Sequence, residues 1–126
     1  MAKYIPGICN IGPKEIAARR TMGYLGIILT AIFIFLSLDQ EFPKWWRIFV
    51  IFPGTFAAIG FIQAKSNFCV SYGLMGLSNI SGSINKTSAV TERSSKLADL
   101  KKSIQLLAYS VIIGMVITAL LTFLLP

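Results

Sequence analysis

The sequence contains no histidine and only two cysteines, Cys9 and Cys69, among its 126 residues. A structural zinc site normally needs four Cys or His ligands, so these residue types cannot build one. The lack of histidine also removes the most common haem ligand and the most common general base. The sequence has no Gly-rich phosphate loop and no nucleophile elbow. These absences predict that the protein is not an enzyme and that it binds no cofactor or metal.

Charged residues are also scarce. They make up 13% of the chain, whereas hydrophobic residues make up 55%. Soluble globular domains carry about 25% charged residues, so this composition is typical of an integral membrane protein. The formal net charge of +7 would also suit nucleic acid. Because the cations flank apolar stretches, contact with lipid headgroups explains them better, and we expect no nucleic-acid partner.

Three apolar stretches without charges, 21–38, 48–64 and 103–126, predict transmembrane helices at about 21–38, 46–64 and 103–125. A spanning helix needs about 20 residues. The predicted fold class is therefore an all-α membrane protein, with a single membrane domain over residues 1–126. The first two spans are joined by a short polar turn and are expected to form a hairpin. A cytoplasmic loop over about 65–102 is expected to end in an amphipathic segment that leads into the third span.

Two prolines bear on the helices. The first helix is expected to begin near Pro13, since proline is favoured at the first helical position. Residues 13–20 then either extend the first span or form a separate surface helix. Pro53 removes a backbone donor inside the second span, so a kink is expected there.

The distribution of Lys and Arg predicts the orientation of the chain. Cations gather in the N-terminal segment and in the 65–102 loop, while the first connection holds only Lys44 and Arg47. The positive-inside rule then places the N-terminus in the cytoplasm and the C-terminus outside, in a bacterial inner membrane. Four residues are expected to anchor the helices at the membrane surface: Trp45, Trp46, Arg19 and Arg20.

Small and hydroxyl-bearing residues recur every four positions in the third span, at Ser110, Gly114, Thr118 and Thr122. Gly54 and Ala58 offer a similar face on the second span. Such faces let helices approach closely. Two interpretations remain open at this point: packing within the chain, and docking of another membrane protein or a second copy.

Cys69 lies in the segment FIQAKSNFCVSYGLMGL, residues 61–77. Lys65 stands four residues before it, and a nearby cation is one means of activating a thiol. Cysteine is also a normal small hydrophobe in a packed turn. We expect packing at this position, with a reactive thiol at Cys69 and Cys9 as the alternative.

Two groups of residues carry a family resemblance: Asn10-Ile11-Gly12 with Arg19, Arg20 and Gly23, and FCVSYGLMG at 68–76. Over residues 9 to 77 the chain resembles the YgaP-type small bacterial inner-membrane domain, a family associated with rhodanese. Val70 stands where that family usually has proline, and the third span lies outside its two-helix unit. The sequence has no rhodanese domain, so sulfur transfer is not implied. The resemblance implies a helical hairpin with both ends in the cytoplasm.

These observations favour a non-enzymatic membrane protein, a structural or accessory subunit that packs against other membrane proteins or against itself. The expected partners are membrane lipids, and other membrane protein subunits or a homo-oligomer. All five acids lie outside the spans, which argues against a proton-coupled transporter. Two alternatives remain open: a thiol- or sulfur-handling membrane protein that uses Cys69 and Cys9, and a small passive channel or transporter.

Overall fold

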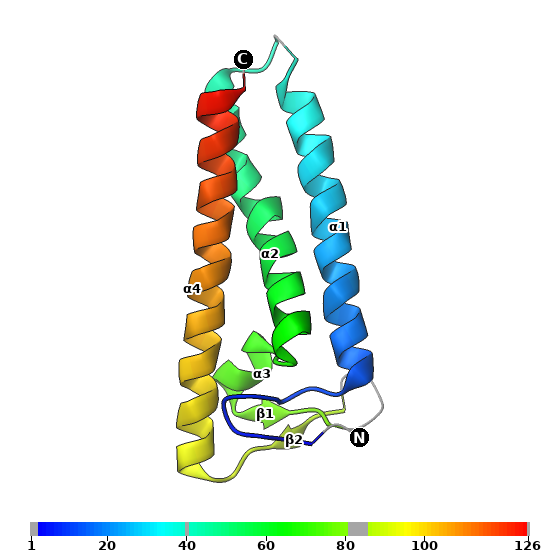
Figure 1. Ribbon diagram of the computed structural model, residues 1–126, viewed down its shortest axis with the longest axis vertical. Coiled ribbons are helices and arrows are strands. Elements are labelled where there is room, and N and C mark those ends of the chain that lie inside the picture. Colours follow the sequence, from blue (N-terminus) through cyan, green and yellow to red (C-terminus); the bar gives the residue numbers. More distant parts are fainter. Residues whose placement is uncertain (1–2, 40, 81–85, 126) are drawn as a thin grey trace.

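The structure is a computed structural model in which residues 3–39, 41–80 and 86–125 are described. Three long helical segments dominate it (Figure 1). They are α1 (Pro13–Ser37), the 3-10 helix η1 (Lys44–Val50) continued by α2 (Ile51–Ser66), and α4 (Arg93–Leu124). Each segment is long and apolar enough to cross a membrane. The prediction of a mostly helical chain with three apolar helices of spanning length is confirmed.

Helices α1 and α4 extend beyond the apolar stretches that the sequence marks as spans. α1 begins at Pro13, as expected, and runs without a break through residues 13–20 into the apolar stretch. An ion pair between Glu15 and Arg19, with 3.1 Å between Oε2 and Nη2, supports these first turns. α4 begins at Arg93 and is likewise continuous into the span predicted at 103–125.

Pro53 causes a different irregularity from the one expected. The chain follows a 3-10 helix over Lys44–Val50 and becomes α-helical at Ile51. Pro53 therefore falls in the first turn of α2, where a backbone N–H has no partner within the α-helix. Instead of a kink in the middle of a helix, the structure shows a change of helix type just before the proline.

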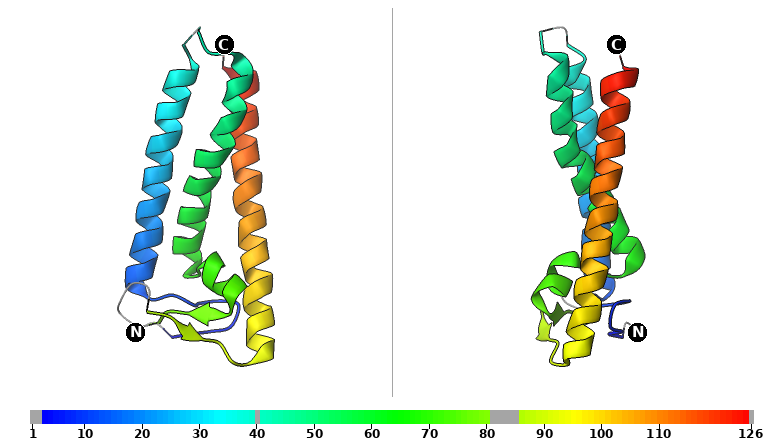
Figure 2. Two further views of the ribbon diagram at one scale, coloured as in Figure 1. Left: turned by 180° about the vertical axis from the view of Figure 1, so that it is seen from behind. Right: turned by 90° about the vertical axis from the view of Figure 1, so that its left-hand side faces the viewer.

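The three spans lie in a single layer with α2 in the middle (Figures 1 and 2). α1 and α2 run in opposite directions, and α4 runs in the same direction as α1. The buried share of the apolar window is 33% for the central segment Lys44–Ser66, but only 11% for α1 and 22% for α4. Each outer helix therefore keeps a broad apolar face exposed.

Glycines bring α1 and α2 into backbone contact. A Cβ atom added at Gly26 would lie 2.5 Å from the Ala57 Cα, and one added at Gly60 would lie 2.5 Å from the Gly23 nitrogen. Side-chain carbons do not approach other atoms this closely, so these positions leave room only for hydrogen. No hydrophobic effect drives helices together in lipid, so the van der Waals contacts made at this close approach take its place.

Short elements close the end of the molecule that holds the N-terminus (Figure 1). They are α3 (Val70–Met75), β1 (Leu77–Ser78) and β2 (Ser88–Ala89), and the two strands pair antiparallel. Ile11 of the N-terminal segment forms an isolated parallel bridge with Asn79. The predicted 65–102 loop thus contains ordered elements, and its part 81–85 lies outside the described residues.

We predict that Gly26→Ala destabilises the protein by about 1–3 kcal/mol, because the new methyl group overpacks the contact with Ala57. Gly54→Ala is the matched control, since its Cβ would come no nearer than 3.9 Å to the Gly114 Cα. Thermal unfolding in mild detergent measures both. A Gly26→Ala protein that unfolds at or above the wild-type midpoint would contradict the backbone contact.

Candidate functional site

A group of polar side chains gathers at the end of the molecule that holds the N-terminus. Asn10 belongs to the N-terminal segment, and Glu15 and Arg19 belong to α1. Cys69 directly precedes α3, Tyr72 lies in α3, and Asn79 directly follows β1. We call this group the polar cluster. Asn10, Glu15, Cys69 and Asn79 are each at most 1% exposed. Polar groups buried to this degree need partners, so their contacts decide what the cluster does.

Asn10 is the structural centre of the polar cluster. Its Oδ1 accepts a hydrogen bond of 2.6 Å from the Cys69 backbone nitrogen, and its Nδ2 donates one of 3.1 Å to the Cys69 carbonyl. Its backbone nitrogen donates to the Asn67 carbonyl at 3.1 Å, and its carbonyl accepts from the Asn79 nitrogen at 2.8 Å. One buried side chain therefore ties the residue before α3 to the segment that begins α1.

Arg19 lies between the carboxylate of Glu15 and the sulfur of Cys69. Its Nη2 donates to Glu15 Oε2 at 3.1 Å and to Cys69 Sγ at 3.0 Å. Its guanidinium carbon also lies 5.9 Å from the centre of the Tyr72 ring, within the range of a cation–π contact. The second carboxylate oxygen of Glu15 accepts a longer bond of 3.4 Å from Asn79 Nδ2. The buried carboxylate of Glu15 thus accepts hydrogen bonds from a charged donor, Arg19, and from a neutral donor, Asn79.

Tyr72 is the last member of the polar cluster, and its ring faces the Arg19 guanidinium. Burial, and then the neighbouring carboxylate of Glu15, raises the pKa of its phenol. The phenol therefore stays protonated well above neutral pH and remains a hydrogen-bond donor.

The two cysteines have different surroundings, and both are free thiols. Cys69 is 1% exposed and faces Arg19, whereas Cys9 is half-buried and donates from Sγ to the Ile11 carbonyl at 3.6 Å. The sequence suggested Lys65 as the cation beside Cys69. Lys65 is exposed, and the guanidinium of Arg19 occupies that place instead. A guanidinium next to a sulfur stabilises negative charge on it, but burial opposes that charge.

A second buried carboxylate, Asp99 of α4, holds the N-terminal segment. Asp99 is 0% exposed; its Oδ2 accepts from the Tyr4 hydroxyl at 2.6 Å, and its Oδ1 accepts from the Gly7 nitrogen at 2.7 Å. Burial and the carboxylate of Asp99 raise the pKa of the Tyr4 phenol, which keeps this donor protonated. The sequence did not reveal this contact, because an acid between lysines usually marks a solvated helix face.

The small-residue face of α4 packs inside the chain. Ser110 and Thr118 are 0% and 8% exposed, and a Cβ added at Gly114 would collide with the Thr55 hydroxyl. The hydroxyl groups donate to carbonyls four residues earlier: Ser110 to Leu106, Thr118 to Gly114 and Thr122 to Thr118. On α2, Gly54 is buried and Ala58 is half-buried. Three of the four positions in the stripe are thus buried within the chain, with Gly114 in contact with Thr55 of α2, and Thr122 is half-buried.

The predicted anchor residues divide into two groups. Trp45 and Trp46 are 63% and 39% exposed at the end opposite the N-terminus, and Arg20 is exposed. Arg19 was expected at the membrane surface, but its side chain is 22% exposed and joins the polar cluster. The sequence also missed Arg47, which is 4% exposed and donates to the carbonyls of Leu121 and Leu125 at 3.3 and 2.9 Å. This arginine covers the C-terminal carbonyls of α4.

Searches against protein-family models, curated proteins and solved structures each found no match to this chain. The resemblance to the YgaP-type domain therefore stays a prediction. Residues that carry it, far apart in the sequence, do come together: Asn10, Arg19 and Cys69 belong to the polar cluster. Within the described residues, no three His, Cys, Asp or Glu side chains gather as they would around a metal ion.

We predict that Asn10→Ala destabilises the protein by about 1–3 kcal/mol, because it leaves the buried N–H of Cys69 without its side-chain partner, while the Cys69 carbonyl still accepts from the Gly73 nitrogen. Hydrogen exchange at the Cys69 amide is expected to accelerate. Ser71→Ala, at an exposed position of α3, is the control and should leave both quantities unchanged. If the Cys69 amide in Asn10→Ala stays as protected as in the wild type, Asn10 does not hold α3.

Proposed function

We propose that this chain is a non-enzymatic integral membrane protein that acts as a structural or accessory subunit, packing against other membrane proteins or against a second copy. The observation that carries the proposal is the single-layer arrangement, in which α2 is central and α1 buries only 11% of its apolar window. A layer one helix thick cannot enclose its own apolar surface. Its outer helices are therefore available to neighbours within the bilayer.

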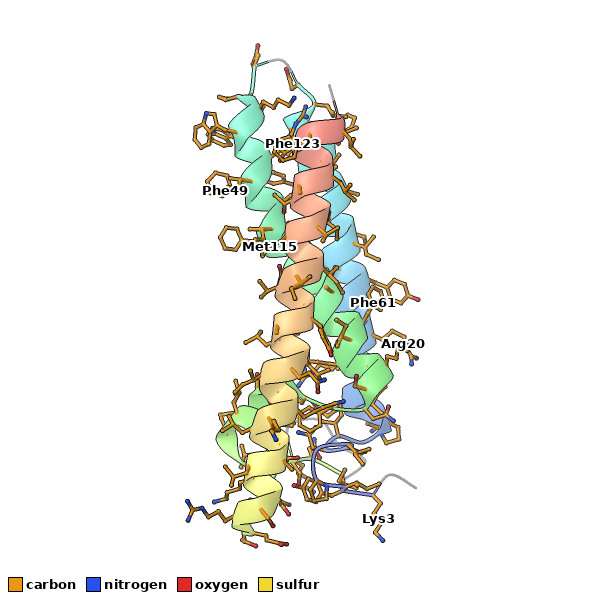
Figure 3. All side chains as sticks on the ribbon, turned by 60° about the vertical axis from the view of Figure 1, so that its left-hand side comes forward. Lys3, Arg20, Phe49, Phe61, Met115 and Phe123 are labelled. Atoms are coloured by element: carbon orange, nitrogen blue, oxygen red, sulfur yellow. The ribbon has the colours of Figure 1, made fainter. Side chains whose placement is uncertain are left out.

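The exposed side chains of α1 suit such a contact. Eight large hydrophobic residues on α1 are 45–77% exposed: Tyr24, Leu25, Ile27, Ile28, Leu29, Ile32, Phe35 and Leu36. Figure 3 shows that large side chains also project outward elsewhere, at Phe49 of η1 and at Met115 and Phe123 of α4. Lipid alone can cover these faces, and α1, whose apolar window is the least buried of the three, is the one we propose for a partner helix.

The state of the polar cluster supports a structural role. Asn10, Glu15 and Asn79 are at most 1% exposed and bonded to other parts of the same chain. A buried carboxylate that already has a guanidinium and an amide donor is poorly placed to take a proton from a substrate. We therefore assign the cluster to holding the N-terminal segment, α1 and α3 together, and not to catalysis.

We also propose an orientation. The helices α1 and α2 form a hairpin with both ends in the cytoplasm, and the N-terminal turns of α4 are a cytoplasmic extension of the third span. The bacterial inner membrane is the proposed location. Support comes from the exposed cations at the N-terminal end, among them Lys3, Lys14, Arg20 and Lys65, and from the tryptophans at the other end.

Native purification in mild detergent tests the subunit function. We expect a co-purifying membrane protein or a stable homo-oligomer. Ile28→Trp, at a position 55% exposed on α1, is expected to reduce the recovered partner several-fold, since overpacking an interface costs about 1–3 kcal/mol. Ile112→Trp, also 55% exposed but on α4, is the matched control. A strictly monomeric protein without a partner would contradict the proposal.

One contact favours a second candidate function, a thiol- or sulfur-handling membrane protein. Arg19 Nη2 lies 3.0 Å from Cys69 Sγ, and a guanidinium at this distance stabilises a thiolate. Cys9 lies in the neighbouring N-terminal segment and would be the second thiol. A small passive channel has less support, because a single layer of three helices encloses no path and a pore would need several copies.

Alkylation with iodoacetamide separates the two functions. If Cys69 packs, it reacts at neutral pH at least about tenfold more slowly than the half-buried Cys9, because opening must precede reaction. The single variants Cys9→Ala and Cys69→Ala assign each rate. A Cys69 that reacts faster than a free thiol, and loses that advantage in Arg19→Gln, would favour the thiol function instead.

A further inference from the structure

The N-terminal turns of α4 and the adjacent helix α3 expose a continuous apolar surface. Five residues form it, with exposed fractions of 37–63%: Leu74, Met75, Leu97, Leu100 and Ile104. We call this surface the apolar patch. One groove in it lies between α3 and α4, and a second runs along α4. Lys96 lines the first groove and Lys101 lines the second.

The polarity of this part of α4 is the reverse of that of a helix in a soluble protein. The polar residues Ser95, Asp99 and Ser103 are buried, at 7%, 0% and 0% exposure. The apolar residues Leu97 and Leu100 point outward. In water this arrangement would leave the apolar side exposed and is unfavourable. The patch therefore requires an apolar covering.

The patch continues the exposed apolar face of the membrane-spanning part of α4. From Leu97 the exposed positions proceed at helical spacing through Ile104, Val111 and Met115, which are 38–57% exposed. No break separates the side chains next to the hydrocarbon from those of the patch. The same covering, lipid, is the simplest one for both.

The length of α4 places the patch at the membrane surface. Its 32 residues extend about 48 Å, compared with about 30 Å for the hydrocarbon core. Counting about 20 residues back from Leu124 puts the edge of the core near Ile104. Leu100 and Leu97 then lie roughly 6 and 10 Å beyond that edge, at the depth of the headgroups.

The charges at this end of the molecule are almost all positive. Exposed cations at this end include Lys3, Lys14, Arg20, Lys65, Lys86, Arg93, Lys96 and Lys101. The acids Glu15 and Asp99 are buried and bonded, which leaves Glu92 as the exposed acid among the described residues of this end. A Cβ added at Gly76 would lie 3.6 Å from Lys96 Cε, so the stem of Lys96 passes over the end of α3.

We propose that the apolar patch is a binding site for an anionic phospholipid, whose chain lies along Leu97, Leu100 and Ile104 and whose headgroup phosphate is bound by Lys96 and Lys101. The patch supplies the apolar contact, and the two lysines attract a phosphate whose negative charge is not offset, as it is by the choline cation of a zwitterionic headgroup. The proposal rests on the membrane location given above. It does not require a protein partner.

Native mass spectrometry of the purified full chain in mild detergent tests this site. The probes are phosphatidylglycerol and phosphatidylcholine with identical acyl chains. We expect phosphatidylglycerol to bind at least about tenfold more tightly, and the variant Lys96→Gln/Lys101→Gln to lose most of that preference, since each lysine near an anionic surface contributes a several-fold effect. Lys44→Gln/Lys86→Gln removes the same charge from exposed positions outside the patch and should bind as the wild type does.

Three results would overturn the proposal. They are equal binding of the two lipids, an equal loss in the control variant, and displacement of the lipid by an excess of inorganic phosphate, which would show a simple anion site. Far-ultraviolet circular dichroism and size exclusion confirm that the variants fold. Because the measurement uses the isolated chain, it stays readable if native purification yields only a monomer and the subunit function fails.

Discussion

The exchange of hydrogen bonds between the Asn10 side chain and the Cys69 backbone holds together the end of the molecule where four segments meet. It fixes the residue before α3 against Asn10 of the N-terminal segment, which leads into α1. Once this contact exists, Arg19 of α1 faces Cys69, the residue before α3, and Tyr72 of α3. The Arg19–Cys69 hydrogen bond and the cation–π contact with Tyr72 depend on this placement, because Arg19 is distant from both residues in the sequence. The Glu15–Arg19 ion pair is local to α1.

The same end of the molecule connects to α4 by close packing. A Cβ at Gly73 of α3 would collide with the hydroxyl of Ser103, and the Asp99 carboxylate binds the N-terminal segment. These contacts use the polar side of α4 and turn its apolar side outward. Because α3 and the N-terminal segment attach to the polar side of α4, that side is buried and the apolar patch on the opposite side is exposed. At the other end, Arg47 performs a comparable task for the last carbonyls of α4.

Two kinds of surface follow from this arrangement. The middle of the molecule is a layer of three helices whose outer faces are apolar and whose contacts are made by glycine and hydroxyl residues. The end with the N-terminus is basic outside and has its acids inside, apart from Glu92. The first surface suits neighbouring membrane helices, and the second suits an anionic lipid layer. Both proposed interactions therefore use parts of the chain that its internal contacts leave uncovered.

The sequence by itself determined the three apolar helices and the start of α1 at Pro13, because both depend on local composition. It also identified Ser110, Gly114 and Thr118 as a packing face, but it did not say what packs there. Tertiary structure decided that α2 packs against this face at Gly114. It also decided that Arg19 and not Lys65 lies beside Cys69, and that Asp99 and Arg47 are buried. The physical reason is that lipid is as apolar as a protein interior. Hydropathy therefore predicts that a helix spans the membrane, but the direction in which each face points depends on contacts between distant segments.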